Sequence, residues 1–498
     1  MIPLTVDEIA RAVGGTLHDV PDPTARVTGP VVHDSRQVAP GGLFAAVVGE
    51  RVDGHDYAAA AVAAGAVAVL ASRPVAGEGG AGVPAVLVDD VVAALGRLAR
   101  AVTDRLTDTT VIGLTGSSGK TSTKDLIGQM LGRLGPTVAT PGSLNNEIGL
   151  PLTALTAEPS TRHLVLEMGA RGIGHIAYLT GLTPPRIGVV LNVGTAHIGE
   201  FGGREAIAQA KGELVEALPP GDAAPGRGGV AVLNADDPLV RAMASRTRAR
   251  VVLFGESADA EVRAENVRLD PAGRPRFTLR TPEGSADVGL RLYGEHHVSN
   301  ALAAAAVARE CGMTPDDTAA ALGEAGALSR WRMEVVERAD GVTVINDAYN
   351  ANPDSMRAAL RTLATMAGGS RTTWAVLGAM RELGEASLAE HDAVGRLAVR
   401  LNVTHLVAVG GQEAAWLDMG ARNEGSWGEE SVLVSDAQAA VDLLRNAVRP
   451  GDVVLVKASR SEGLEKVADA LLADVPPATA TAAHGELADS AGDGATTR

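Results

Sequence analysis

The chain of 498 residues contains few aromatic side chains and a single cysteine, Cys311. One cysteine excludes a disulfide framework within the chain and is typical of a protein from a reducing compartment. Because phenylalanine, tyrosine and tryptophan together make up only 2% of the residues, alanine, valine and leucine must fill the interior.

The sequence also lacks a long hydrophobic run and an excess of positive charge. Its longest apolar stretch, 58–71, is alanine-rich, is interrupted by Gly65 and is shorter than the about 20 residues that span a bilayer. The N-terminal segment MIPLTVDEIARAVGG carries early acids instead of the cationic start of a secretion signal. A net charge of −16 disfavours binding to nucleic acid or to an anionic membrane. We therefore expect a soluble, cytoplasmic protein with no nucleic-acid or membrane partner.

Short apolar runs alternate with amphipathic helical stretches, which is typical of α/β domains with largely parallel sheets. The length predicts about three domains. The apolar runs fall into three groups: 43–49, 66–70 and 85–90, followed by a helix over 91–106; then TVIGLTG, HLVLEMG, RIGVVLNVG and GVAVLNADD; then VTVINDAYN, TWAVLGAM, HLVAVG, SVLVS and DVVLVKAS. The tail from Pro476 has no periodicity and is predicted to be disordered.

The segment LTGSSGKTSTKD (114–125) resembles a phosphate-binding loop, G-x-x-x-x-G-K-[ST], in which Leu114 replaces the first glycine. TVIGLT predicts a buried strand, and 120–134 predict a helix. The apolar stripe of that helix would be Leu126, Ile127, Met130, Leu131 and Leu134.

The turn between this strand and helix is formed by Gly116, Ser117, Ser118 and Gly119. Backbone N–H groups and the helix dipole at such a junction favour phosphate. Lys120 would reach the terminal phosphates and the Thr121 hydroxyl would bind magnesium. A glycine- and serine-rich turn without a ligand is the alternative.

Two further strands predict polar groups at the same edge of the sheet, because ligands bind outside the carboxyl ends of parallel strands. HLVLEMG places Glu167 there, and VVLNVGTAHIGEFG places His197 just past its strand. A carboxylate behind apolar strand residues needs a cation, so Glu167 is a candidate magnesium ligand. His197, taken alone, is explained as well by a structural role.

In REAIAQAKGELVEAL, Lys211 falls on the same helical face as Ile207, Leu214 and Leu218, so it is predicted to point inward. Desolvation lowers the pKa of a lysine and makes its amine reactive. A neutral amine facing a metal can capture carbon dioxide and become an anionic carbamate ligand. A snorkelling lysine or a salt bridge to Glu167 explains the pattern equally well.

These motifs, taken in order, resemble those of the Mur ligases, the ATP-dependent amide-bond-forming enzymes of cytoplasmic peptidoglycan synthesis. The similar segments are TGSSGKTSTK, LEMGARGIGHI, NVGTAHIGEFG, AKGEL, LNADDP and YGEHHVSNALAA. Residues 33–57 resemble the uridine-binding segment of the family. Residues 346–356 and 377–391 resemble the members that add D-alanyl-D-alanine to a UDP-N-acetylmuramoyl-tripeptide.

The resemblance implies an α/β protein of three domains, usually a monomer. The domains would be an N-terminal uridine-binding domain (1–106), a central P-loop ATP-binding domain with a mostly parallel sheet (107–327) and a C-terminal Rossmann-like ligase domain (328–475), followed by the tail (476–498). Two positions depart from the family pattern: Ala458 stands where glycine is expected, and Ala379 where aspartate is common.

The resemblance also assigns the ATP and metal sites. Thr121 and Glu167 would hold one Mg²⁺ ion, and His197 with a carbamylated Lys211 a second, which favours the carbamate over its alternatives. Lys120, Glu167, His197 and Lys211 would be the catalytic residues. The ATP site would comprise Gly116, Ser117, Ser118, Gly119, Lys120, Thr121 and Ser122, with His296 and Asn300 at the adenine and Arg332 and Asp347 at the phosphates and ribose.

The other substrates are assigned in the same way. Ser35 and Arg36 would lie near the uridine, and Asn145 and Asn146 would line the muramoyl-peptide path. Tyr349 and Asn350 would lie where the dipeptide binds, although a structural role explains them nearly as well. ATP would convert the terminal carboxylate of the tripeptide into an acyl phosphate, which the dipeptide amine then attacks.

Four other functions are to be weighed against this hypothesis. A family member that adds a diamino acid would carry a D-N-P-R-like motif where this chain has NDAYNANPDSM, and a folylpolyglutamate synthetase would not need the segment 33–57. A P-loop protein that hydrolyses nucleotide slowly would leave Glu167, His197 and Lys211 without a common purpose. A scaffolding role in the cell-wall machinery is compatible with activity.

Overall fold

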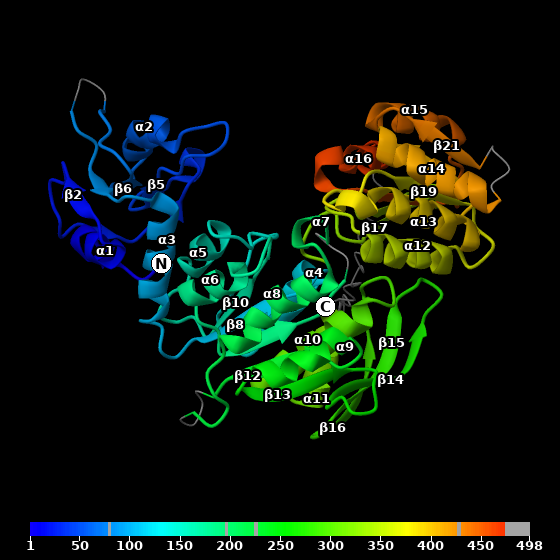
Figure 1. Ribbon diagram of the computed structural model, residues 1–498, viewed down its shortest axis with the longest axis horizontal. Helices are drawn as coiled ribbons and strands as arrows, with labels where there is room; N and C mark the ends of the chain where they lie inside the picture. Colours follow the sequence, from blue (N-terminus) through cyan, green and yellow to red (C-terminus); the bar gives the residue numbers. More distant parts are fainter. Residues whose placement is uncertain (78–80, 195–197, 224–227, 426–429, 474–498) are drawn as a thin grey trace, which may run out of the picture.

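The computed structural model describes residues 1–77, 81–194, 198–223, 228–425 and 430–473. Three α/β units follow one another along the chain, from the N-terminal unit through the central unit to the C-terminal unit (Figure 1). The fold class predicted from the sequence is confirmed. The tail 476–498 lies outside the described residues, as does His197.

The N-terminal unit has a five-stranded sheet in the order β2-β7-β6-β5-β4, with β2 (Thr16–His18) and β4 (Val31–Val32) at its edges. Its three predicted strands are present but short, at β5 (Leu43–Ala45), β6 (Ala68–Ala71) and β7 (Ala85–Leu87). Helix α3 (Val91–Thr103) is capped by Asp90, whose side chain accepts hydrogen bonds from the Val92 and Ala93 N–H groups. Such caps satisfy N–H groups that lack a partner within the helix. Helix α3 packs against α5 (Gly149–Ala154) of the central unit, and this contact joins the two units.

The central unit contains a nine-stranded sheet in the order β16-β15-β14-β13-β12-β11-β8-β10-β9. The neighbouring strands between β9 and β14 pair in parallel, and the two remaining pairs, β14–β15 and β15–β16, are antiparallel. The sheet is therefore mostly parallel, as predicted, with an antiparallel extension at one edge. Its strands are β8 (Thr110–Thr115), β9 (Thr137–Ala139), β10 (His163–Glu167), β11 (Ile187–Val190), β12 (Val230–Asn234), β13 (Arg250–Gly255), β14 (Val262–Leu269), β15 (Pro275–Thr281) and β16 (Gly284–Gly289).

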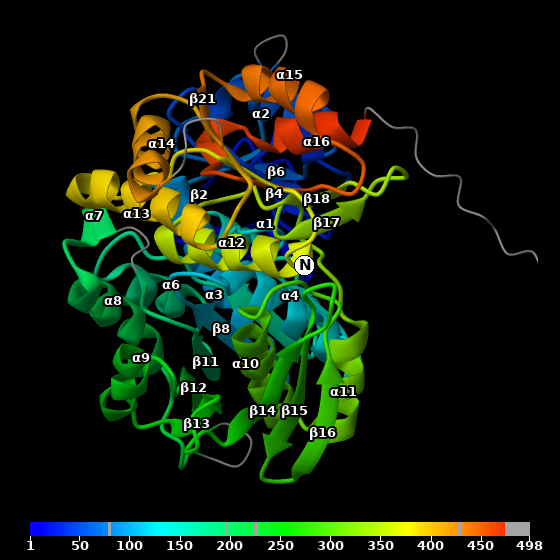
Figure 2. The same cartoon turned by 90° about the vertical axis from the view of Figure 1, so that its right-hand side faces the viewer.

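Helices cover both faces of this sheet (Figures 1 and 2). On one face, α4 (Lys120–Leu131) packs against α10 (His297–Glu310), and on the other lies α8 (Arg204–Glu216). The predicted apolar stripe of α4 is buried except for Leu134, which is 41% exposed because the helix ends three residues earlier. Including Leu134 in the stripe was therefore wrong.

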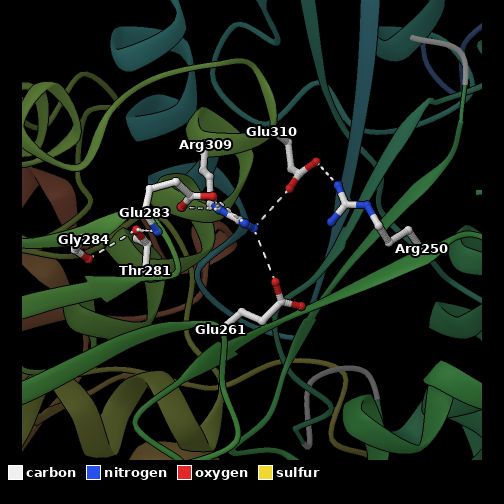
Figure 3. A network of polar contacts seen from close by, with 7 residues as sticks. All are labelled: Arg250, Glu261, Thr281, Glu283, Gly284, Arg309 and Glu310. Atoms are coloured by element: carbon white, nitrogen blue, oxygen red, sulfur yellow. Dashed lines mark hydrogen bonds and ion pairs between the residues drawn. The ribbon is translucent and has the colours of Figure 1, made fainter. Parts of the chain in front are cut away.

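A cluster of ion pairs fastens the end of α10 to the antiparallel extension (Figure 3). The Arg309 guanidinium donates hydrogen bonds to both oxygens of Glu283 at 2.7–2.9 Å and to Glu261 at 3.4 Å. Glu310, the next residue, pairs with Arg250 of β13. The helix that bears His296 and Asn300 at its start is thus fixed to the sheet at its other end.

The C-terminal unit, which we call the third domain, has a six-stranded sheet in the order β17-β18-β22-β19-β20-β21. All pairs are parallel except β17–β18. Its strands are β17 (Glu334–Glu337), β18 (Thr343–Asn346), β19 (Thr373–Leu377), β20 (His405–Val409), β21 (Ser431–Val434) and β22 (Val453–Lys457). Helices α12 (Pro353–Ala367) and α13 (Ser387–Arg400) lie on the face nearer the central unit (Figure 1).

No helix in the described ranges is both long enough and apolar enough to cross a membrane.

Candidate active site

Three neighbouring parallel strands of the central sheet end at the same edge. The order β11-β8-β10 places the ends of these strands side by side, with Glu167 paired in register with Leu114. The turn after β8 and the carboxylate at the end of β10 therefore face the same space. This is the edge at which α/β sheets bind ligands.

The predicted phosphate loop has the expected strand–turn–helix geometry. Gly119 adopts a φ of +78°, which favours glycine, and directly precedes α4. Lys120 Nζ donates a hydrogen bond of 2.7 Å to the Gly116 carbonyl oxygen, so its ammonium curls back over the turn. Burial lowers the pKa of Lys120, and the Glu167 carboxylate partly offsets this effect.

Asn192, at the end of the β11 segment, completes the loop. Its Oδ1 accepts hydrogen bonds from the Ser117 and Ser118 N–H groups at 3.0 and 2.9 Å. These amides are therefore directed toward a single oxygen acceptor, which is the arrangement that binds a phosphate oxygen. Asn192 was not predicted from the sequence, although it follows an apolar strand as Glu167 does.

Glu167 is 1% exposed, and both its oxygens are hydrogen-bonded. Oε2 accepts from Thr121 Oγ1 at 2.9 Å, and Oε1 accepts from Asn145 Nδ2 at 2.7 Å. The hydroxyl and the carboxylate predicted to share a magnesium ion thus lie in direct contact. The Asn146 side chain instead turns toward α5, where its Oδ1 accepts a hydrogen bond of 2.9 Å from the N–H of Gly149, the first residue of that helix.

Lys211 points inward, as the helical periodicity predicted. It is 4% exposed and lies on the buried face of α8 with Ile207 and Leu214. Within the described ranges its side chain has no hydrogen bond or ion pair, and the oxygens of Glu167 are bonded to Thr121 and Asn145, so neither a solvated amine nor a salt bridge to Glu167 is present. Burial, together with the nearby charge of Lys120, lowers the pKa of Lys211 well below its ordinary value.

The third domain supplies the opposite wall. Asp347 Oδ2 forms an ion pair of 2.6 Å with Lys457 Nζ, and the Arg332 guanidinium lies 4.2 Å from the centre of the Tyr349 ring. The Tyr349 hydroxyl contacts Ser143 Oγ of the central unit. Lys457 was not predicted, because a lysine that ends a buried strand gives no sign in the sequence of which acid it meets.

His296 and Asn300 approach the phosphate loop from α10. The Asn300 side chain lies so close to Gly119 that a Cβ atom at that glycine would be 2.5 Å from Asn300 Oδ1. Burial lowers the pKa of His296 to about 4, so its imidazole is neutral at physiological pH. A neutral ring can both donate and accept hydrogen bonds, as contact with a purine base requires.

One cavity of about 780 Å³ unites these groups. Gly116 does not line it because it packs against Leu191, and Ser35 and Arg36 lie apart in the N-terminal unit, where Arg36 pairs with Asp34. The predicted residues that line the cavity are Ser117, Ser118, Gly119, Lys120, Thr121, Ser122, Asn145, Asn146, Glu167, Lys211, His296, Asn300, Arg332, Asp347, Tyr349 and Asn350.

The cavity brings a phosphate loop, a paired hydroxyl and carboxylate, and a buried amine together with a third domain that faces them. This arrangement is the one expected of a three-domain, ATP-dependent ligase. Models of this class match the chain in three parts: "Mur ligase family, catalytic domain" over 30–103, "Mur ligase middle domain" over 114–308, and "Mur ligase, glutamate ligase domain" over 331–460. The chain belongs to the Mur ligase family.

Individual members of the family show which kind of Mur ligase the chain resembles. The chain is 52% identical to the UDP-N-acetylmuramoyl-tripeptide–D-alanyl-D-alanine ligase of Mycobacterium tuberculosis, over 95% of this chain and 98% of that protein. The enzyme of the same name from Escherichia coli is 36% identical over 95% and 99%. A crystal structure of MurF from Acinetobacter baumannii superposes with a TM-score of 0.83 at 33% identity, covering 95% and 99%. MurF from Thermotoga maritima in complex with ADP gives 0.75 at 31% identity, covering 90% and 98%.

Proposed function

We propose that this protein ligates D-alanyl-D-alanine to a UDP-N-acetylmuramoyl-tripeptide in peptidoglycan precursor synthesis, with conversion of ATP to ADP and phosphate. The full-length similarity to ligases of that name supports these substrates. The observation that carries the chemistry is the single cavity in which the phosphate loop, Glu167 and Lys211 face residues of the third domain.

The donors at this site fit magnesium. A hydroxyl and a carboxylate are hard oxygen ligands, and Mg²⁺ completes its shell with water and phosphate oxygens, so few protein ligands are needed. Thr121 and Glu167 would hold one ion, and His197 with Lys211, as its carbamate, a second. Bound magnesium would neutralise the charge that develops on the transferred phosphoryl group.

The chain's own residues would position the reactants. The amides of Ser117 and Ser118 and the Lys120 ammonium would hold the phosphates, while His296 and Asn300 would contact the adenine. Arg332 and Asp347 would approach from the third domain, so that the site is complete only when the domains are together. Excluding water at that stage would protect the acyl phosphate from hydrolysis.

The remaining subsites follow the same plan. The N-terminal unit, with Ser35 and Arg36, would bind the uridine end, and Asn145 and Asn146 would border the peptide. The dipeptide would reach the cavity beside Tyr349 and Asn350. The protein would act as a cytoplasmic monomer without nucleic acid or membrane as partner.

Product formation under substrate omission tests the proposal. ADP release should require both the UDP-tripeptide and D-alanyl-D-alanine, and mass spectrometry should detect the UDP-pentapeptide. Turnover with a free diamino acid and a UDP-dipeptide would instead identify a diamino-acid ligase. ADP release without either substrate would identify a nucleotide hydrolase.

A further inference from the structure

Lys457 is a buried lysine in the cavity that the chemistry above leaves unused. It ends β22, is 2% exposed, and its Nζ donates hydrogen bonds to Asp347 Oδ2 at 2.6 Å and to the Asn350 carbonyl oxygen at 2.8 Å. An ammonium removed from water is costly unless acceptors surround it. The geometry of these two acceptors therefore indicates what the lysine does.

The two acceptors stand at opposite ends of one short loop, 347–350, which follows β18. In the proposed function, Asp347 contacts the nucleotide at one end of this loop, and Tyr349 and Asn350 border the dipeptide at the other. A single ammonium thus ties together the segment that faces two different substrates. The bond to the Asn350 main chain sets the path of the loop independently of the side chains that it presents.

Other contacts of the loop lead away from Lys457. Asp347 Oδ1 accepts a hydrogen bond of 3.0 Å from the N–H of Met333, in the connection between the central unit and β17. Arg332, one residue earlier, stacks on Tyr349. Displacement of the loop would therefore move Arg332 and the Tyr349 ring together.

Lys457 also neutralises the charge of the Asp347 carboxylate. Asp347 is 9% exposed and lines the cavity proposed to hold a triphosphate. Without Lys457 this carboxylate would be a buried, unpaired anion beside other anions, which is strongly unfavourable. The lysine thus makes an acidic residue compatible with a polyphosphate site.

We propose that Lys457 is a positioning residue that holds the 347–350 loop in the form required by both ATP and D-alanyl-D-alanine. This inference rests on the proposed function for the identity of the two ligands. It predicts that the loss of Lys457 weakens the use of both ligands while leaving the UDP-tripeptide unaffected, since the N-terminal and central units bind the latter.

Lys457→Met is the first test, with Lys466→Met, an exposed residue of α16 (Glu465–Ala473) in the same domain, as its matched control. Displacement of a binding group by about 1 Å costs on the order of 10²-fold in rate. We expect KM for ATP and for the dipeptide to rise about tenfold or more, with KM for the UDP-tripeptide and all constants of the control close to wild type. Unchanged constants, or an equal rise in all three, would overturn the proposal.

Lys457→Arg provides a second test that does not depend on a buried methionine being tolerated. Arginine keeps the positive charge near Asp347, but its planar guanidinium cannot reproduce the geometry of the ammonium. Calorimetric binding of ATP should therefore stay closer to wild type than binding of D-alanyl-D-alanine. Equal affinity of wild type and variant for both ligands would refute the positioning role.

Calorimetry also separates this inference from the proposed function. Wild-type protein that binds ATP but fails to form the UDP-pentapeptide would overturn the proposed function. The comparison of ATP affinity between the wild type and Lys457→Met would still test the link from Lys457 to Asp347. An Asp347→Asn background should remove most of the effect of Lys457→Met on ATP, because the two residues act as one pair; additive effects would contradict the link.

Discussion

Thr121 and Glu167 are 46 residues apart in the chain, yet the Thr121 hydroxyl donates a hydrogen bond of 2.9 Å to Glu167 Oε2. Thr121 lies in the first turn of α4, and Glu167 ends the neighbouring strand β10. The contact therefore fixes the phosphate loop against the sheet edge. It also brings two oxygen donors to one point, where they can share a divalent cation.

Replacement of Glu167 by glutamine tests this pair. The amide keeps the shape of the side chain but removes the negative charge that a magnesium ion requires. We expect kcat to fall by about 10²-fold or more and the magnesium concentration for half-maximal ADP release to rise. Glu158→Gln, an exposed residue of the same unit, is the control. An unchanged magnesium dependence in Glu167→Gln would rule out the assigned role.

Lys211 gives the second prediction, because its amine is buried without a partner in the part of the chain that the structure describes. Lys211→Ala should reduce ADP release to below about 1% of wild type, and acetate or propionate should restore part of it by replacing the carbamate. Lys211→Met, which fills the same space, should not respond to added carboxylates. A Lys211→Ala variant that also fails to respond, together with an unmodified lysine in the intact wild-type mass, would contradict the carbamate.

Arg309 tests the ion-pair cluster of Figure 3 as a determinant of stability. Its hydrogen bonds lower the pKa of Glu283 to about 2. Because the Glu283 side chain is 49% exposed, solvent weakens this pair, and we expect Arg309→Met to cost about 1 kcal/mol. The melting temperature should therefore fall by about 2–4 °C, with kcat unchanged.

The pH dependence of this effect has a definite sign. The folded-state pKa of Glu283 is depressed, so its stabilisation is present above the unfolded value of 4.5 and disappears as the pH falls toward about 2. The difference in melting temperature between wild type and Arg309→Met should shrink over that range, and high salt should reduce it at neutral pH. A difference that is independent of both would show that lost packing dominates.

His391 supplies a second pH effect, in the third domain. It is fully buried, its Nε2 accepts a hydrogen bond of 2.9 Å from the Met380 N–H, and its Nδ1 donates one of 2.6 Å to the Ser387 carbonyl oxygen. The neutral ring fulfils both roles, and burial lowers its pKa. Its stabilisation is therefore present above the unfolded value of 6.5 and is lost as the pH falls below it, by up to about 1.4 kcal/mol per pH unit.

His391→Gln removes this titration while its amide oxygen can still accept from Met380. We expect the variant to be less stable than wild type by about 1 kcal/mol at pH 7.5, through loss of the bond to Ser387. The gap should narrow as the pH is lowered from 6.5, because only the wild type loses the contribution of the histidine. Urea unfolding at pH 7.5 and 5.5 measures it, and parallel curves would refute the assignment.

Local sequence patterns predicted a large part of this fold. The apolar runs identified most parallel strands of the three units, although β5 ends at Ala45, four residues before the predicted end, and the parallel strands β4, β9 and β13 were not predicted. The helical spacing of Lys211 with Ile207 and Leu214 predicted its burial correctly. The antiparallel strands β14–β16 were not predicted, because their alternating, half-exposed residues form no continuous apolar run.

The sequence by itself determined where chemistry is possible: a glycine turn before a helix, a carboxylate behind a buried strand, an amine on an apolar helix face. These signals depend on residues close together in the chain, whose backbone geometry follows from their spacing. Only the tertiary structure decided the partners: Asn192 on the loop amides, Ser143 on Tyr349, and Lys457 on Asp347 across 110 residues. Each of these contacts depends on how strands are ordered in a sheet and how two domains meet, which no local pattern specifies.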